Sequence, residues 1–123
     1  MELKATELSA EPEDGEYLAY FYLRDDKKDY CFSLSRYTHE DFDDGFIEVM
    51  VSDQIHTKTP DLSLILNRES VIVRLPSQVA SELDCDAEFL IDIGNFVDKI
   101  ELIHKTLNTI FRGKTGFSNT ILK

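Results

Sequence analysis

Tryptophan is absent from this 123-residue sequence, and cysteine, proline and glycine are scarce, with two, three and five residues. Cys31 and Cys85 are too few for a disulfide scaffold, and neither belongs to the C-x-x-C pair typical of zinc or redox sites. No run approaches the roughly eighteen apolar residues that a membrane span requires, and the first residues lack the pattern of a secretory signal. We therefore expect a cytoplasmic protein that has no membrane partner and keeps both thiols reduced.

Basic residues are also few, because 13 Lys and Arg stand against 24 Asp and Glu, which gives a net charge of −11. The imbalance lies in residues 1–56, where fifteen acids and five bases give −10. No cluster of Lys and Arg could neutralise phosphates, so direct binding to nucleic acid is disfavoured. Two interpretations of the acidic half remain open: a solvated face that confers solubility, or a surface that attracts a basic partner.

Motifs of catalysis and metal binding are missing as well. The sequence contains no G-x-S-x-G, no Walker loop and no G-x-G-x-x-G. His39, His56 and His104 are far apart and form no zinc-binding pair. The acidic segment from His39 to Gly45 does not fit the register of an EF-hand calcium loop. We therefore predict a protein that is not an enzyme and uses no cofactor and no metal.

Segments that alternate apolar and polar residues recur along the chain, a pattern typical of half-buried β-strands. Two of them flank the short polar turn at residues 67–70, which indicates an antiparallel hairpin. Residues 52–60 are polar and are interpreted as a connection. The expected strands are residues 17–23, 30–35, 46–51, 62–66, 71–75 and 87–93, with residues 1–8 as a further edge strand.

A helical periodicity runs from Asn95 to Gly113, with Asn95 expected as the N-cap and Gly113 as a left-handed C-cap. A shorter helix is expected at residues 76–83. The 42% apolar composition favours one folded domain, 1–123, with residues 114–123 either a docked arm or a frayed tail. The predicted fold is α+β: an antiparallel sheet of six or seven strands covered on one face by the long C-terminal helix, plus the short helix. The apolar stripe of the long helix is Phe96, Ile100, Ile103, Leu107 and Ile110.

Leu102 lies away from that stripe on the expected helix. A single exposed leucine is ordinary on a protein surface. Contact with the C-terminal tail, or with a second subunit of a homodimer, is the other interpretation.

The densest acidic segments are two of the connections between expected strands. Loops that join antiparallel strands can lie at the same end of a sheet, so we predict one negative rim that steers a basic partner. Aromatic residues in these segments would then anchor the partner. The alternative is that Phe42 pins its own loop to the core. The candidate partner-binding residues are Asp25, Asp26, Asp29, Tyr37, Glu40, Asp41, Phe42, Asp43 and Asp44.

Three features from Tyr30 to Arg112 together resemble a known family. They are the strand YCFSLSR followed by an acidic loop and FIEVMVSDQ, the hairpin LSLILNRESVIVRL leading into SQVASEL, and AEFLIDI followed by IELIHKTLNTIFRG. This pattern resembles the Imm10 family of bacterial immunity proteins. The resemblance implies a cytoplasmic protein, encoded beside a toxin gene, that binds and neutralises its cognate toxin.

A small acidic binder suits a basic toxin, since complementary charge raises the association rate. Two rival functions remain open. One is an acidic binding or regulatory module that mimics nucleic acid. The other is a small-ligand-binding domain with its pocket between helix and sheet.

Overall fold

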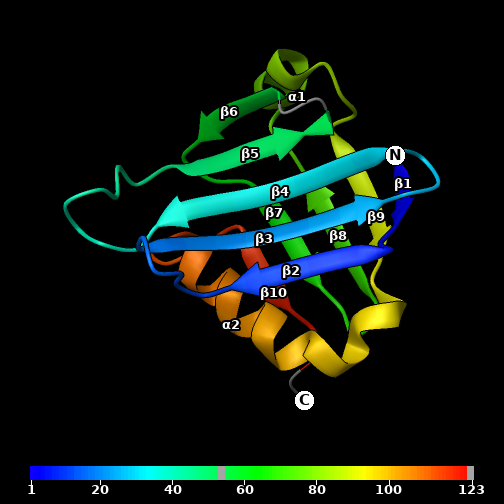
Figure 1. Cartoon of the computed structure of the whole chain (residues 1–123). Helices are drawn as coiled ribbons and strands as arrows, with labels where there is room; N and C mark the ends of the chain where they lie inside the picture. Colours follow the sequence, from blue (N-terminus) through cyan, green and yellow to red (C-terminus); the bar gives the residue numbers. More distant parts are fainter. Residues whose placement is uncertain (53–54, 122–123) are drawn as a thin grey trace.

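The computed structural model describes residues 1–52 and 55–121, which form two five-stranded sheets and two α-helices (Figure 1). We call the first the meander sheet, because its strands follow chain order and each neighbouring pair is antiparallel. Its strands are β2 (Glu7–Glu11), β3 (Leu18–Asp25), β4 (Tyr30–Tyr37), β5 (Ile47–Val51) and β6 (Ile55–Thr59).

The second sheet, here the mixed sheet, has the order β1-β9-β8-β7-β10. The pairs β7–β8 and β8–β9 are antiparallel, whereas β1–β9 and β7–β10 are parallel. The predicted hairpin of β7 and β8 is therefore confirmed, with Leu64 opposite Val73 and Leu66 opposite Val71. The strands are β1 (Glu2–Lys4), β7 (Ser63–Leu66), β8 (Ser70–Arg74), β9 (Glu88–Asp92) and β10 (Phe117–Asn119).

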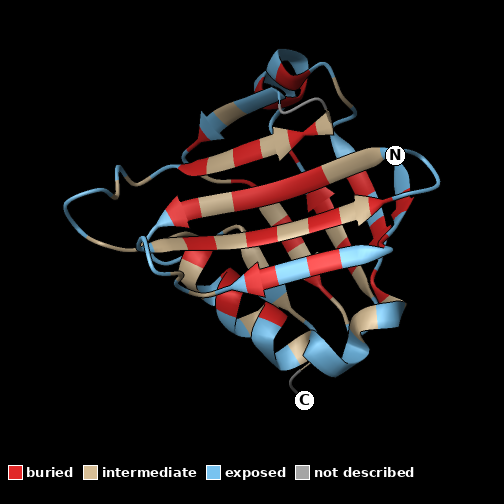
Figure 2. Ribbon diagram, in the orientation of Figure 1, coloured by how far each residue is buried: buried red, intermediate tan, exposed pale blue. Residues whose placement is uncertain are grey.

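The α+β class is confirmed, but the prediction of one sheet of six or seven strands is wrong. Each sheet has one apolar face, and these faces cover each other, as the contact between Phe32 of β4 and Phe89 of β9 illustrates, with ring centroids 5.2 Å apart. Figure 2 shows the result as alternating buried and more exposed residues along the strands. A second sheet thus buries most of the apolar surface that we had assigned to the helix.

Two further strand assignments need correction. The single edge strand expected at residues 1–8 is two short strands, β1 and β2, and they belong to different sheets. The polar connection expected at residues 52–60 contains the edge strand β6; its residues 53 and 54 lie outside the described part of the chain. Polar residues suit such an edge strand, because β6 has only one strand beside it and four of its five residues are partly or fully exposed.

The long helix is shorter than expected. A 3₁₀ segment (Gly94–Lys99) comes first, and α2 proper spans Ile100–Ile110, because Phe96 has non-helical angles of φ −125° and ψ 27°. Asn95 is therefore not its N-cap, whereas Gly113 has the predicted left-handed conformation, with φ 77°. The short helix is confirmed as α1 (Ser77–Leu83). No helix in the described ranges is long and apolar enough to span a membrane.

Helix α2 packs against both sheets at one end of the molecule (Figure 1). It contacts β2, β3 and β4 of the meander sheet and β10 of the mixed sheet. Ile103, Leu107 and Ile110 are fully buried, as the stripe predicted. The tail forms β10, which pairs with β7 and thus corresponds to the docked-arm alternative as far as Asn119. Residues 122 and 123 lie outside the description.

We predict that Leu107→Ala lowers the free energy of unfolding by about 2–5 kcal/mol, because the transfer energy of the side chain is lost and a cavity is left. Urea denaturation measures this change. The exposed neighbour Asn108→Ala is the matched control and should change stability by less than about 0.5 kcal/mol. Equal midpoints and slopes for Leu107→Ala and the unmodified protein would contradict this packing.

Candidate functional site

The two acidic clusters predicted to form one rim lie at opposite ends of strand β4 (Figure 1). The turn with Asp25, Asp26 and Asp29 precedes β4, and the connection at residues 38–46 follows it. Seven steps of about 3.3 Å along the strand separate the two ends by roughly 23 Å. The prediction of a single rim is therefore wrong, because successive connections of a meander alternate between the ends of the sheet.

The carboxylates of the first cluster serve their own turn. Asp25 is buried and accepts hydrogen bonds from the backbone N–H groups of Lys4, Lys27 and Lys28 at 2.8, 3.0 and 3.2 Å. These bonds, led by the one from Lys4, lower the pKa of the Asp25 carboxyl. Asp26 and Asp29 form ion pairs with the Arg24 guanidinium. This cluster therefore stabilises the β3–β4 turn and ties it to the end of β1.

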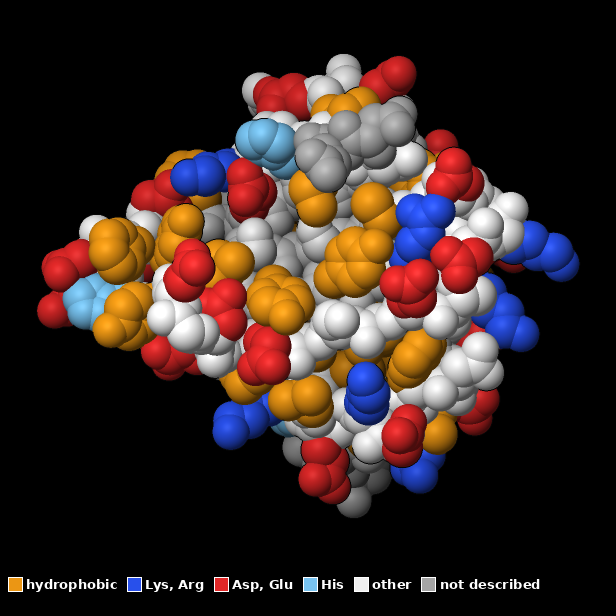
Figure 3. Space-filling view, viewed as in Figure 1, with side chains coloured by type: hydrophobic (Ala, Val, Ile, Leu, Met, Phe, Trp, Pro, Cys, Tyr) orange, Lys and Arg blue, Asp and Glu red, His pale blue; other side chains and the backbone are white. Residues whose placement is uncertain are grey.

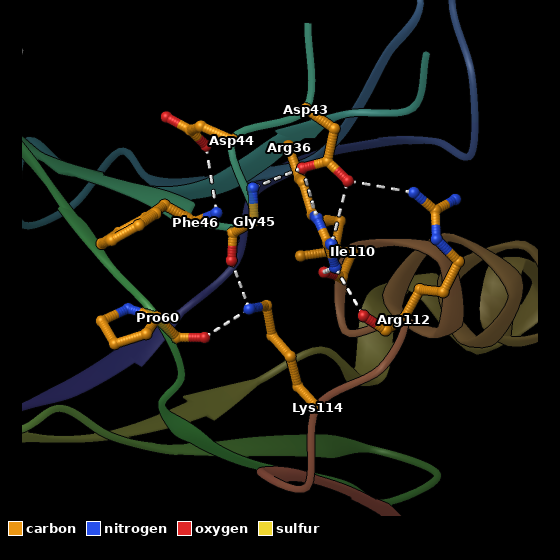
Figure 4. Close-up of polar contacts among 9 residues, drawn as sticks. All are labelled: Arg36, Asp43, Asp44, Gly45, Phe46, Pro60, Ile110, Arg112 and Lys114. Carbon is orange, nitrogen blue, oxygen red and sulfur yellow. Dashed lines mark hydrogen bonds and ion pairs between the residues drawn. The ribbon is translucent and has the colours of Figure 1, made fainter. Parts of the chain in front are cut away.

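In the second cluster, Asp43 is engaged in the same way (Figure 4). Its two carboxylate oxygens accept from Nε and Nη2 of Arg36, both at 3.0 Å, and Arg112 lies 3.2 Å from one of them. The N–H of Gly45 donates to the same carboxylate at 2.9 Å. The hydrogen bond from Arg36 is the main cause that lowers the pKa of Asp43. Asp43 is thus a largely buried ion-pair partner of Arg36, and its carboxylate contributes little to the solvent-accessible surface of the loop.

Arg36 also reaches the end of helix α2. Its Nη1 donates to the carbonyl oxygens of Ile110 at 3.0 Å and Arg112 at 2.7 Å. Lys114, just beyond the helix, donates to the carbonyl oxygens of Gly45 and Pro60 (Figure 4). Arg36, which holds Asp43, and Lys114, which holds Gly45, therefore attach the 38–46 connection to the C-terminal end of α2.

Four rings gather at this end of the meander sheet, and we call Tyr17, Tyr37, His39 and Phe42 the aromatic tip. Ring centroids lie 4.9 Å apart for Tyr17 and His39, and 5.6 Å for His39 and Phe42. Phe42 also lies 5.9 Å from Tyr37 and 6.3 Å from Tyr17. Tyr17, Tyr37 and Phe42 are nevertheless 45%, 46% and 54% exposed. The tip is therefore an apolar cluster that protrudes into solvent, at the left of Figure 3.

Two connections build the tip, and the sequence pattern indicated only one of them. Tyr17 ends the β2–β3 connection, in a left-handed conformation with φ 62°, and its carbonyl accepts from the N–H of Thr38 at 2.7 Å. Asp14 supports this turn by accepting from the N–H groups of Glu16 and Leu18. In an antiparallel meander, successive connections alternate between the two ends of the sheet. The β2–β3 and β4–β5 connections must therefore lie at the same end, and a meander inferred from the sequence would have predicted that Tyr17 lies near Phe42.

Acidic side chains surround the aromatic tip. Residues 11–17 and 37–46 together contain eight acids and no Lys or Arg. Glu40 and Asp41 are exposed, whereas Asp44 forms an ion pair with Lys58 at 2.7 Å. The structure thus retains an acidic surface around Tyr37 and Phe42, with different members from those predicted. The eight acids of the two segments are Glu11, Glu13, Asp14, Glu16, Glu40, Asp41, Asp43 and Asp44, and the side chain of Asp43 is largely buried.

The remaining sequence candidates are dispersed. Among residues 1–52 and 55–121, no group of three or more His, Cys, Asp or Glu side chains is arranged to hold a metal ion. Cys85 is half-buried, and burial raises the pKa of its thiol. Leu102 is 40% exposed, and its contact with a second subunit stays a prediction.

Comparison with known proteins does not assign this chain to a family. No protein-family model matches the chain, and neither curated proteins nor solved structures give a match. The resemblance to the Imm10 family therefore stays an expectation from the sequence. The aromatic tip and its surrounding acids are therefore the candidate functional site.

We predict that Asp43→Asn lowers the free energy of unfolding by about 3–5 kcal/mol at pH 7, because it leaves the buried Arg36 charge without a counterion. Asp41→Asn is the matched control, since the Asp41 side chain is 75% exposed. Urea denaturation measures both variants. A loss for Asp43→Asn no larger than that for Asp41→Asn would contradict the role of this ion pair.

Acid should weaken the unmodified protein through Asp25 and Asp43. Both have a pKa below the ordinary 3.8, so the unfolded chain binds more protons than the folded one near that pH. Their contribution is complete well above pH 3.8 and is lost as the pH falls toward the lowered values. Asp43→Asn should show a shallower loss of stability between about pH 5 and pH 3 than Asp41→Asn.

Proposed function

We propose that this protein is a non-catalytic binding protein that holds a basic partner protein at the aromatic tip. The partner we propose is the cognate toxin that an immunity protein neutralises. The observation that carries the proposal is the exposure of Tyr17, Tyr37 and Phe42 in one cluster within an acidic surface. The toxin as partner, and neutralisation as the outcome, follow from the sequence resemblance.

Aromatic side chains supply much of the energy in protein interfaces, because they bury a large area with few rotatable bonds. The tip suits this role, since its rings contact one another and its loops are fixed. Thr38 is hydrogen bonded to Tyr17, and Asp43 holds its loop to Arg36. A loop that is already ordered loses less conformational entropy when a partner binds.

The surrounding acids define the charge of the partner. Eight carboxylates in the two tip segments produce a negative potential, of which Arg36, Arg112 and Lys58 neutralise only the share of Asp43 and Asp44. Such a field accelerates association with a basic surface and repels acidic proteins and nucleic acid. The partner is therefore a protein with a basic surface around its contact region.

The rival functions fit this surface less well. A nucleic-acid mimic needs carboxylates in place of phosphates, whereas Asp14, Asp25 and Asp43 are engaged by their own turns. A small-ligand domain needs a pocket of roughly 300 Å³ or more. The hollow beside α2, where this alternative places its pocket, measures about 80 Å³ between Ile100, His104 and Ile121, and the hollows of about 330 and 360 Å³ lie elsewhere on the surface. A protein partner therefore accounts better for the exposed rings.

The direct test is to co-express this protein with the product of the adjacent gene and to measure survival and complex formation. We expect the adjacent product to be toxic alone, to be tolerated with this protein, and to co-purify with it in a defined ratio. Toxicity that this protein leaves unchanged would contradict the proposed function.

We predict that the triple variant Glu16→Gln, Glu40→Gln, Asp41→Asn associates with that partner about ten-fold more slowly at low salt, with a small change in dissociation. Its salt dependence should also be flatter. The control is Glu69→Gln, Asp98→Asn, Glu101→Gln, which removes the same charge from exposed acids elsewhere. Stopped-flow measurements at two ionic strengths compare them. Equal association rates for the two variants at low salt would mean that the tip acids are only a solvated surface.

Phe42→Ala should instead accelerate dissociation, by at least about thirty-fold if Phe42 is an anchor worth 2 kcal/mol or more. The alternative, that Phe42 only pins its loop, predicts a loss of folding stability comparable to the loss of binding. Urea denaturation of the same variant separates the two. An unchanged dissociation rate would remove Phe42 from the interface.

A further inference from the structure

A small hollow lies between the aromatic tip and the outer face of the meander sheet. Its volume is about 90 Å³. Strand register explains its position, because Leu18 is opposite Tyr37, and Ser35 is opposite both Tyr20 and Glu48. Because the Ser35 side chain is small, the larger side chains around it enclose a space above the sheet. The lining residues are Leu18, Ser35, Arg36, Tyr37, Asp44, Phe46, Glu48 and Lys58.

Part of the wall of this hollow is apolar and partly uncovered, and the rest carries polar and charged groups. Tyr37 belongs to the aromatic tip and is 46% exposed, and Phe46 is 42% exposed. Leu18 adds an aliphatic surface beside them. Long side chains with an aliphatic stem and a charged end bind favourably in such surroundings, because the stem covers apolar surface while the charge remains near water.

The charged groups at the hollow are the carboxylates of Asp44 and Glu48, the amine of Lys58 and the guanidinium of Arg36. Lys58 Nζ lies 2.7 Å from an oxygen of Asp44, and His56 Nδ1 lies 3.0 Å from an oxygen of Glu48. The remaining cation, Arg36, is already neutralised by Asp43. The hollow therefore accepts an ammonium group from this chain, which indicates the chemistry that it would accept from another.

Lys58 holds its position only weakly. Its side chain is 53% exposed and that of Asp44 is 48% exposed, and exposed ion pairs of this kind contribute little net stability. Lys58 lies on the edge strand β6, so its ammonium group can leave Asp44 and be solvated by water. A second cation that brings its own aliphatic stem can therefore replace it at Asp44.

We propose that this hollow receives one arginine or lysine side chain of the basic partner protein, and that Lys58 competes with it from within the chain. This inference rests on the proposed function, since it names the part of the partner that the tip region recognises. The stem of the incoming side chain lies between Tyr37 and Phe46, and its charge meets Asp44 and Glu48. Lys58 then turns toward solvent, which makes capture selective for a cation that also fits the apolar walls.

The test uses N-acetyl-arginine amide as the probe and amide NMR spectra of the isotope-labelled protein as the readout, at constant ionic strength. We expect saturable shifts at residues around Tyr37, Glu48 and Lys58, with a dissociation constant on the order of 10 mM. N-acetyl-citrulline amide, which has nearly the same shape without the charge, should give no saturable shift. Absence of saturation with the arginine probe up to about 50 mM, or equal shifts with citrulline, would overturn the proposal.

Charge-matched variants test the assigned groups. Glu48→Gln should weaken probe binding several-fold, and Lys58→Gln should strengthen it several-fold by removing the competitor. The controls are Glu101→Gln and Lys105→Gln, which change exposed charges on α2 and should leave probe binding unaltered. Equal affinities for Glu48→Gln and Glu101→Gln, or for Lys58→Gln and Lys105→Gln, would overturn the assignment.

The probe experiment needs no partner protein, so its failure is distinct from failure of the proposed function. If Phe42→Ala accelerates dissociation of the partner while the probe does not bind, the tip is an interface and the hollow is not a side-chain pocket. If the probe binds while the adjacent gene product is not neutralised, the hollow stands and the toxin as partner is rejected.

Discussion

The carboxylate of Asp43 and the guanidinium of Arg36 form the interaction on which the end of the molecule with the aromatic tip depends. Arg36 follows Phe32 and Leu34 on the inward face of β4, so strand alternation directs its charge into the interior. A buried guanidinium without a partner is unfavourable by several kcal/mol. Asp43 neutralises the charge, and the carbonyl oxygens of Ile110, at the end of α2, and of Arg112, just beyond it, accept the remaining hydrogen bonds. The cation also lies at the negative end of the helix dipole.

This constraint determines how the 38–46 connection presents its residues. Asp43 must point inward to reach Arg36, and Lys114 holds the carbonyl of Gly45 from the other side. Glu40, Asp41 and Phe42 precede that fixed point and remain exposed. One acid of the cluster therefore orders the loop, while its neighbours are available to a partner. The same contacts hold the loop of the aromatic tip in place, and a loop that is already ordered loses less conformational entropy when it binds a partner.

The two-sheet arrangement divides the acidic half of the sequence into surfaces with different roles. At one end of β4, Asp25 accepts three backbone N–H groups and so fixes the segment where the chain passes from β1 to β2. At the other end, the β2–β3 and β4–β5 connections meet and combine aromatic with acidic residues. The net charge of −11 is thus partly structural. The exposed acids around the tip are the part that we propose a partner recognises.

Local patterns predicted the strands β3, β4, β5, β7, β8 and β9, the β7–β8 hairpin, helix α1 and the buried stripe of α2, because neighbouring residues decide alternation, turns and helical spacing. Tyr37, Phe42, Glu40 and Asp41 were also named as candidate partner-binding residues, since loop composition is visible in the sequence, but whether Phe42 is exposed or packs on the core stayed open. What the sequence by itself left undecided was the division into two sheets, the separation of Asp25 from the tip, and the addition of Tyr17 to it. Those depend on which strand lies beside which, and on partners such as Arg36 and Ile110, which are 74 residues apart. Pairings at that distance are selected by the burial of all apolar faces together, so only the tertiary structure reveals them.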